Sequence, residues 1–155
     1  MANKKRVQKS SLEKKEISFK SKKTKKEKEF ILWFDEISIE DVPLVGGKNA
    51  SLGEMYRKLK PKGVDVPGGF AISAYSYFYL LEKTGAKDKI KNILDKINTH
   101  DIKELMDKGR KARNTILNLM FPKELEESIC DAYDKLCKQY KTKEVDVAVR
   151  SSATA

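Results

Sequence analysis

The chain has 155 residues, of which 36% are charged and 39% hydrophobic, and its formal net charge at pH 7 is +10. This length suffices for one ordinary globular domain. No apolar run approaches the length of a transmembrane helix, and the first residues lack the apolar stretch of a secretory signal. We therefore expect a soluble, cytoplasmic protein that does not contact membranes.

The positive charge is concentrated at the start of the chain. Residues 1–29 hold twelve Lys or Arg and four Glu, so they carry +8 of the net +10. Such a segment buries too little apolar surface to offset the entropy lost on ordering. We predict a disordered lysine-rich tail at 1–29 and a folded region at 30–155. A solvated extension is the favoured interpretation, and weak nucleic-acid contact through phosphate groups is the alternative.

The first half of the folded region predicts short strands and one long helix. The apolar run "FILWFDEI" at 30–37 favours a strand, and "SIEDVP" after it is typical of a turn or short helical connection. A helix is expected from Asn49 to about "KPKG" at 60–63. Its apolar face comprises Leu52, Met55, Tyr56 and Leu59. "VDVPGGFAIS" at 64–73 predicts a strand, a Pro-Gly-Gly turn and a second strand.

The second half predicts four helices and a closing strand. Ser73 is expected to cap a helix that ends at Gly85, and Asp101 with Glu104 forms a capping box that opens a later one. A helix at 90–97 lies between them, and Pro122 suits the start of the last. The apolar faces are Ala74, Tyr77, Phe78 and Leu81; Ile90, Ile93, Leu94 and Ile97; and Leu125, Ile129, Ala132, Tyr133, Leu136 and Tyr140. Alternation of valines at 145, 147 and 149 predicts a strand whose partners lie outside this sequence. The fold class is α/β in the broad sense (α+β) and helix-rich.

The two cysteines, Cys130 and Cys137, are seven residues apart in the last predicted helix. Their Cα atoms would lie about 10 Å apart, which is too far for a disulfide. We predict reduced thiols on a core face and no metal site around them.

The fragment "VPLVGGKNASLGEM" at 42–55 places two glycines and a lysine at a predicted helix start. Gly46 and Gly47 let the backbone approach a ligand closely, and the first amides of a helix can donate to an anion. Lys48 adds a charge that can reach phosphate oxygens. The fragment is not a Walker A loop, which needs G-x-x-x-x-G-K-[ST]. A plain turn with a solvated lysine is the alternative.

A second fragment, "VDVAVRSSATA" at 145–155, places an arginine at the end of the predicted strand. Arg150 can hold phosphate with its planar guanidinium, and the hydroxyls of Ser151, Ser152 and Thr154 can add hydrogen bonds. Ligands of α/β proteins usually bind at the carboxyl ends of strands. The two fragments together favour a nucleotide phosphate site.

Three segments, "LWFDEISIEDVPLVGGKNASLGEM", "GVDVPGGFAIS" and "VAVRSSATA", carry a resemblance in their order and spacing. They are similar to the N-terminal nucleotide-binding region of the phosphoenolpyruvate synthases, also called pyruvate, water dikinases. The resemblance covers 30–155 and is weaker to pyruvate, phosphate dikinases and rifampicin phosphotransferases, which share the ATP-grasp module.

The resemblance implies the first part of an ATP-grasp domain in which Lys48 and Arg150 contact ATP phosphates. It implies a full-length enzyme that converts pyruvate, ATP and water into phosphoenolpyruvate, AMP and phosphate. One interpretation is that this enzyme is a homo-oligomer. Mg²⁺ and a phosphohistidine intermediate would take part. The metal ligands, the phosphohistidine domain and the pyruvate-binding barrel are expected outside this sequence, with no catalytic residue within it. We therefore expect this chain alone to be inactive.

The sequence departs from the family where Pro-Pro-Gly-Phe is usual, because residues 67–70 read Pro-Gly-Gly-Phe. A non-catalytic binding module with a nucleic-acid-binding tail is the rival hypothesis to the enzyme.

Other side chains have two interpretations each. His100 is expected in a surface or capping role rather than as the phosphocarrier. Trp33, with Phe30 and Phe34, favours a β core over an interaction patch. The tyrosines at 75, 77 and 79 cannot all share one helix face, so at most some stack on an adenine. A solvated turn is favoured over a metal site for Asp35, Glu36, Glu40 and Asp41.

Overall fold

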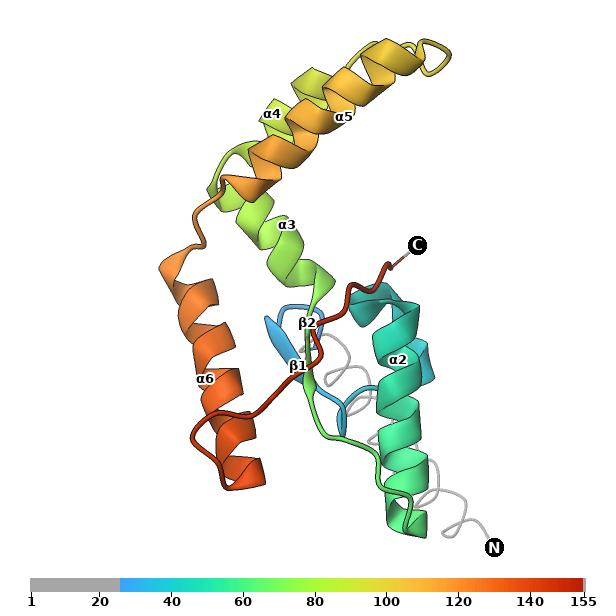
Figure 1. The fold of residues 1–155 in the computed structure, drawn as a ribbon, viewed down its shortest axis with the longest axis vertical. Coiled ribbons are helices and arrows are strands. Elements are labelled where there is room, and N and C mark those ends of the chain that lie inside the picture. Colours follow the sequence, from blue (N-terminus) through green and yellow to red (C-terminus); the bar gives the residue numbers. More distant parts are fainter. Residues whose placement is uncertain (1–25, 155) are drawn as a thin grey trace, which may run out of the picture.

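The computed structural model describes residues 26–154, which form five α-helices, two 3-10 helices and one two-stranded sheet (Figure 1). The elements are β1 Ile31–Trp33, η1 Ile39–Asp41, α2 Val42–Leu59, η2 Lys60–Lys62, β2 Phe70–Ile72, α3 Ala74–Lys83, α4 Ala86–Leu94, α5 Ile102–Leu117 and α6 Lys123–Tyr140. The prediction of a helix-rich chain with short strands is confirmed. The tail predicted at 1–29 lies outside the described residues except for its last four positions.

The sheet lies between α2 and α6 (Figure 1). β1 and β2 are antiparallel, with Ile31 opposite Ile72 and Trp33 opposite Phe70. The core joins the sheet to the start of α2. Its buried members are Leu32, Ile37, Val45, Ala50 and Ala71. The strand run at 30–37 is thus confirmed for three residues, after which the chain turns into η1.

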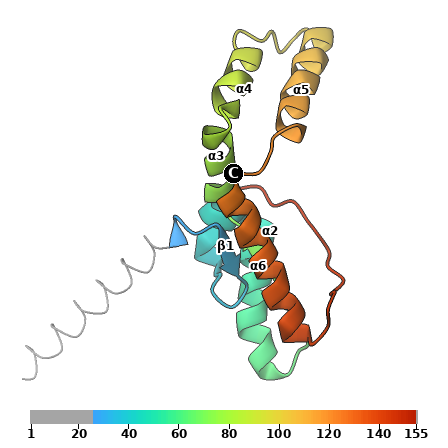
Figure 2. The same cartoon turned by 90° about the vertical axis from the view of Figure 1, so that its left-hand side faces the viewer.

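Helices α3, α4 and α5 form an arm that leads away from the sheet (Figures 1 and 2). The predicted cap at Ser73 is confirmed, since its Oγ accepts a hydrogen bond from Ser76 N. Asp101 is confirmed as a cap, because its carboxylate accepts bonds from the amides of residues 103 and 104. The capping box predicted with Glu104 is wrong, because Asp101 N donates to the Asn98 carbonyl oxygen and Glu104 pairs with Lys108. Gly85 ends α3 with φ of 66°. The Tyr79 hydroxyl donates to the Glu124 carboxylate and so links α3 to α6.

Two predicted strands are absent from residues 26–154. Residues 64–69 are irregular because their polar groups bind elsewhere: Gly68 N donates to the Tyr140 hydroxyl at 2.8 Å, a bond that proline could not make. Residues 145–149 are also unpaired, and Val149 is 91% exposed. A strand needs a neighbouring strand for its amides, and the described residues supply none here.

Two predicted helix faces are partly wrong. On α2 the buried residues include Ala50 and Gly53, whereas Met55 is exposed. On α3 the buried residues include Leu80, whereas Tyr77 and Phe78 are exposed. Small residues let α2 approach the core more closely than its large side chains would allow. The face predicted on α6 is confirmed at its centre, where Leu125, Ala132 and Leu136 are buried.

Gly53 shows how tight this approach is, and it gives a prediction. A Cβ at Gly53 would lie 2.6 Å from Ile37 Cβ and 2.8 Å from the Ile37 carbonyl oxygen, and Ile37 is fully buried. Gly→Ala inside a helix normally stabilises by about 1 kcal/mol. Here we expect Gly53→Ala to lower the free energy of unfolding by about 1–3 kcal/mol through overpacking.

Denaturant unfolding measures this effect, and Gly109→Ala on α5 is the matched control. The nearest atom to a Cβ at Gly109 is the flexible end of Arg113 at 3.4 Å. We expect that control to be neutral or stabilising by up to about 1 kcal/mol. Equal effects of the two substitutions would contradict the packing at Ile37.

Lys26 anchors the start of the described chain to η1. Its Nζ lies 2.9 Å from Asp41 Oδ2 and 2.6 Å from the Glu36 carbonyl oxygen, and Ser38 N donates to the same carboxylate at 2.8 Å. Partial burial raises the pKa of Asp41, but the hydrogen bonds and charge of Lys26, with the bonds from Ser38, more than offset this. The pKa of Asp41 therefore lies below its usual value.

This lowered pKa predicts a pH dependence of stability. A carboxyl with a lowered folded-state pKa contributes stability that is present above the unfolded-state pKa of about 3.9 and is lost as the pH falls below it. We expect Asp41→Asn to be less stable than the wild type at pH 7 and the difference to shrink below about pH 4. Denaturant unfolding across pH 2–7 measures it, at about one-unit steps. A difference that does not change with pH would argue against an ionised Asp41 paired with Lys26.

Both cysteines are free, Cys137 buried and Cys130 exposed. The prediction of thiols on a core face is confirmed for Cys137 and wrong for Cys130, which lies on a part of α6 that no described segment covers. Within 26–154, no helix is both long and apolar enough to cross a bilayer.

Candidate functional site

The Gly-Gly-Lys fragment lies at a break in α2. Gly46 has φ of 78° and ψ of 161°, so the opening turn at 42–45 and the helix that follows are separate helical segments. A backbone of this kind is almost confined to glycine. Lys48 is therefore in the first turn after the break, as the sequence predicted for the start of a helix.

The end of the described chain lies against this break. Gly47 N donates to the Ala153 carbonyl oxygen at 3.2 Å, and Asn49 N donates to Ser152 Oγ at 3.4 Å. In Figure 1 the final segment passes from α6 across the sheet to the start of α2, next to the C label. The two fragments, about a hundred residues apart in sequence, thus form one site.

Gly46 makes the closest approach in this site. A Cβ there would overlap Ser152 Oγ and lie 2.5 Å from the Ala153 carbonyl oxygen, and the residue is buried. Only a residue without a side chain fits, because both the positive φ and the neighbouring segment exclude a Cβ.

Lys48 and Arg150 are both exposed beside this junction. Neither forms an ion pair or a side-chain hydrogen bond with any residue of 26–154. Lys48 lies between the two amides that bind the final segment, and Arg150 is two residues before Ser152. The site therefore presents two cations whose charge no described carboxylate neutralises, which favours an anionic ligand.

Not every predicted role at this site agrees with the geometry. We expected the first amides of the helix to be available to an anion, but those of residues 47 and 49 already bind the final segment. Ser151 and Thr154 are exposed, and their hydroxyls form no hydrogen bond to described residues. Sequence reasoning missed Asn49, whose side chain also donates to the Val45 carbonyl oxygen at 3.0 Å. No local signal pointed to this role, because the side chain of Asn49 donates to a carbonyl oxygen, whereas an N-cap side chain accepts from an amide.

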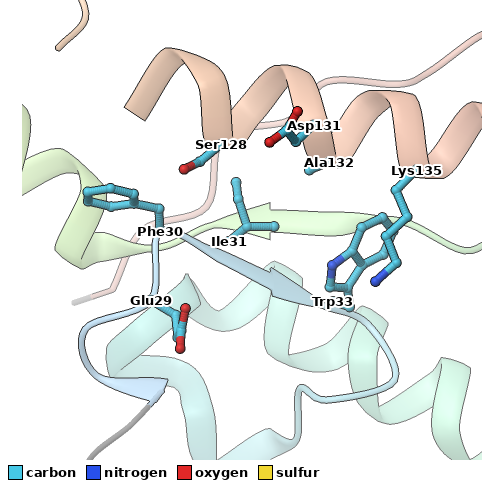
Figure 3. A pocket seen from close by; sticks show the side chains of 8 residues that line it. All are labelled: Glu29, Phe30, Ile31, Trp33, Ser128, Asp131, Ala132 and Lys135. Atoms are coloured by element: carbon cyan, nitrogen blue, oxygen red, sulfur yellow. The ribbon is translucent and has the colours of Figure 1, made fainter. Parts of the chain in front are cut away.

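A cavity of about 290 Å³ lies elsewhere, between β1 and α6 (Figure 3). It is bordered by Trp33, over whose ring Lys135 Nζ lies at 4.5 Å from the centroid. None of the predicted phosphate-binding residues lines this cavity. Trp33, Phe30 and Phe34 are half-buried, so the position in a β core predicted for them is only partly confirmed.

The remaining candidates take structural positions. Tyr75 and Tyr79 lie against Phe30, with ring centroids 5.5 and 4.8 Å from it, while Tyr77 contacts Phe78 instead.

His100 is in an exposed turn, where its amide binds the Asn98 side chain. Among residues 26–154, no group of three or more His, Cys, Asp or Glu could hold a metal ion. The nucleic-acid contact predicted for the tail stays a prediction, since residues 1–25 are not described.

Comparison with known proteins identifies the family. Residues 42–155 match the family described as "Pyruvate phosphate dikinase, AMP/ATP-binding domain". The chain belongs to this family. The matched range begins at the first residue of α2 and contains both of the fragments that meet at Gly46.

Among curated proteins, the chain is similar to several phosphoenolpyruvate synthases. It is 52% identical over 130 residues to the phosphoenolpyruvate synthase of Aquifex aeolicus, and this alignment covers 84% of this chain and 15% of the relative. It is 46% identical over 134 residues to the Synechocystis protein, an alignment that covers 84% of this chain and 16% of the relative. It is 41% identical over 125 residues to the Escherichia coli protein, with an alignment that covers 81% of this chain and 16% of the relative. The chain thus spans about one sixth of the length of these relatives.

Proposed function

We propose that this chain is the first part of the nucleotide-binding domain of a phosphoenolpyruvate synthase and that Lys48 and Arg150 bind the phosphates of ATP. The observation that supports the proposal is the junction at Gly46, where hydrogen bonds join the two segments that carry these exposed cations. Its position within an AMP/ATP-binding domain and the similarity to phosphoenolpyruvate synthases support the same ligand and enzyme.

The two cations suit the chemistry of phosphoryl transfer. That reaction depends mainly on positioning the phosphates and neutralising their charge. Lys48 would act as a compact point charge, whereas Arg150 can bind two phosphate oxygens in one plane. The hydroxyls of Ser151 and Thr154, which form no hydrogen bond to described residues, would add contacts to the same phosphates. Mg²⁺ would accompany the ATP, with its protein ligands outside the described residues.

The full-length enzyme would convert pyruvate, ATP and water into phosphoenolpyruvate, AMP and phosphate through a phosphohistidine. No described residue is assigned as the phosphocarrier or as a pyruvate ligand, so these roles belong to other parts of that enzyme. The segment at 145–149 would pair with strands from those parts.

The test is a product assay on the full-length protein with ATP, Mg²⁺ and pyruvate. We expect AMP, inorganic phosphate and phosphoenolpyruvate in equal amounts, with no requirement for added phosphate. Formation of pyrophosphate that depends on added phosphate would identify a pyruvate, phosphate dikinase instead. AMP formation that depends on rifampicin rather than pyruvate would identify an antibiotic phosphotransferase, and no ATP turnover or binding would support a binding module.

A further inference from the structure

We propose that Ser152, together with Gly46 and Asn49, positions Lys48 and Arg150 rather than binding the nucleotide itself. The inference rests on the proposed function, because it concerns how the two phosphate-binding side chains are held. It replaces the direct phosphate contact suggested above for Ser152 with an indirect role.

The hydroxyl of Ser152 is already used within the protein. Its Oγ accepts from Asn49 N, and it lies directly against the bare Cα of Gly46. A phosphate oxygen would compete for this space, and the amide of Gly47 is likewise occupied by the Ala153 carbonyl oxygen. These contacts therefore occupy the Ser152 hydroxyl and the Gly47 amide, which a phosphate would otherwise bind.

The same contacts fix the two cationic residues. Lys48 lies between the two amides that donate to the final segment, so its backbone is held on both sides. Arg150 is joined to this point through Ser151 alone, because Ser152 is the first described residue after Arg150 that forms a hydrogen bond with α2. Asn49 completes the arrangement, since its side chain holds the Val45 carbonyl oxygen on the other side of the break. Without the bond to Ser152, the bond from Gly47 N to the Ala153 carbonyl oxygen would be the one hydrogen bond left between α2 and the final segment of the described residues.

The substitution that tests this role is Ser152→Ala in the full-length protein, with Ser152→Thr as the conservative variant that keeps the hydroxyl. Ser51→Ala is the matched control, because Ser51 is an exposed serine on the same helix whose hydroxyl forms no hydrogen bond to described residues. Two quantities are measured: hydrogen exchange of peptides covering residues 47–52 without nucleotide, and the Kd for ATP.

We expect Ser152→Ala to accelerate exchange at residue 49 and to raise the Kd for ATP, each by about fivefold, which corresponds to one ordinary hydrogen bond. Ser152→Thr should restore both to within about twofold, a margin well below one such bond. Ser51→Ala should change neither, and the KM for pyruvate should not respond to Ser152→Ala.

Lys48→Ala distinguishes the positioning role of Ser152 from the proposed phosphate site. If Lys48→Ala weakens ATP binding but Ser152→Ala does not, the positioning role is wrong and the proposed function stands. If exchange at residue 49 is the same in wild type and Ser152→Ala, the bond itself is absent and the inference is overturned. If Lys48→Ala leaves the Kd for ATP unchanged, the proposed phosphate site is wrong and the inference fails with it.

Discussion

Replacing Lys48 or Arg150 with alanine is expected to weaken ATP binding by the full-length protein by about 10- to 100-fold each. A hydrogen bond between a charged side chain and an anion contributes about 1.5–3 kcal/mol, and each cation can form at least one with a phosphate. The double variant should lose less than the sum of the two free-energy changes, because both cations act on one triphosphate. Calorimetric titration with a non-hydrolysable ATP analogue measures the affinities.

Two matched controls separate this effect from a general loss of positive charge. Lys91→Ala on α4 and Arg113→Ala on α5 remove the same side chains from exposed positions on the arm. We expect both controls to bind the analogue within about twofold of the wild type, since charges beyond a Debye length of about 10 Å are screened. Equal losses in the controls and the site variants would show that the cations act only through net charge.

Gly46→Ala is expected to lower the free energy of unfolding by about 2–5 kcal/mol. Strain from the glycine-only backbone costs about 1–3 kcal/mol, and the overlap of a Cβ with the final segment adds a similar amount. The loss should appear as a lower denaturant midpoint with an unchanged m-value. A variant that fails to fold would agree with the same expectation.

The adjacent glycine provides the control for Gly46. A Cβ at Gly47 would meet no atom within 4 Å, and the residue has no positive φ. Gly47→Ala should therefore change the free energy of unfolding by no more than about 1 kcal/mol, in the stabilising direction if helix propensity dominates. If the two alanine variants were equally stable, the break at Gly46 would not need its glycine.

The sequence by itself determined the order of the helices and the residues that cap two of them. These depend on local rules: Ser73 and Asp101 accept bonds from amides two or three residues away, and helical spacing identifies the face of α6. Lys48 and the glycines at 46 and 47 likewise predict an anion site from neighbouring residues alone. The family likeness could be stated from three short motifs, and the matched range of 42–155 confirms it.

Only the tertiary structure decided which residues are buried and which amides are occupied. Ala50 and Gly53 are buried, and Gly53 lies directly against Ile37. Helical periodicity cannot reveal this burial, because small residues give little apolar signal. The valines at 145–149 alternate as a strand should, yet a strand also needs a partner, which no described segment supplies. The junction at Gly46 also depends on tertiary structure. From local sequence, Ser152 is a solvent-exposed hydroxyl and Asn49 is the start of a helix. The hydrogen bond between them forms only because the chain returns to Gly46. Long-range contacts of this kind depend on where the whole chain places two distant segments, so local sequence patterns do not predict them.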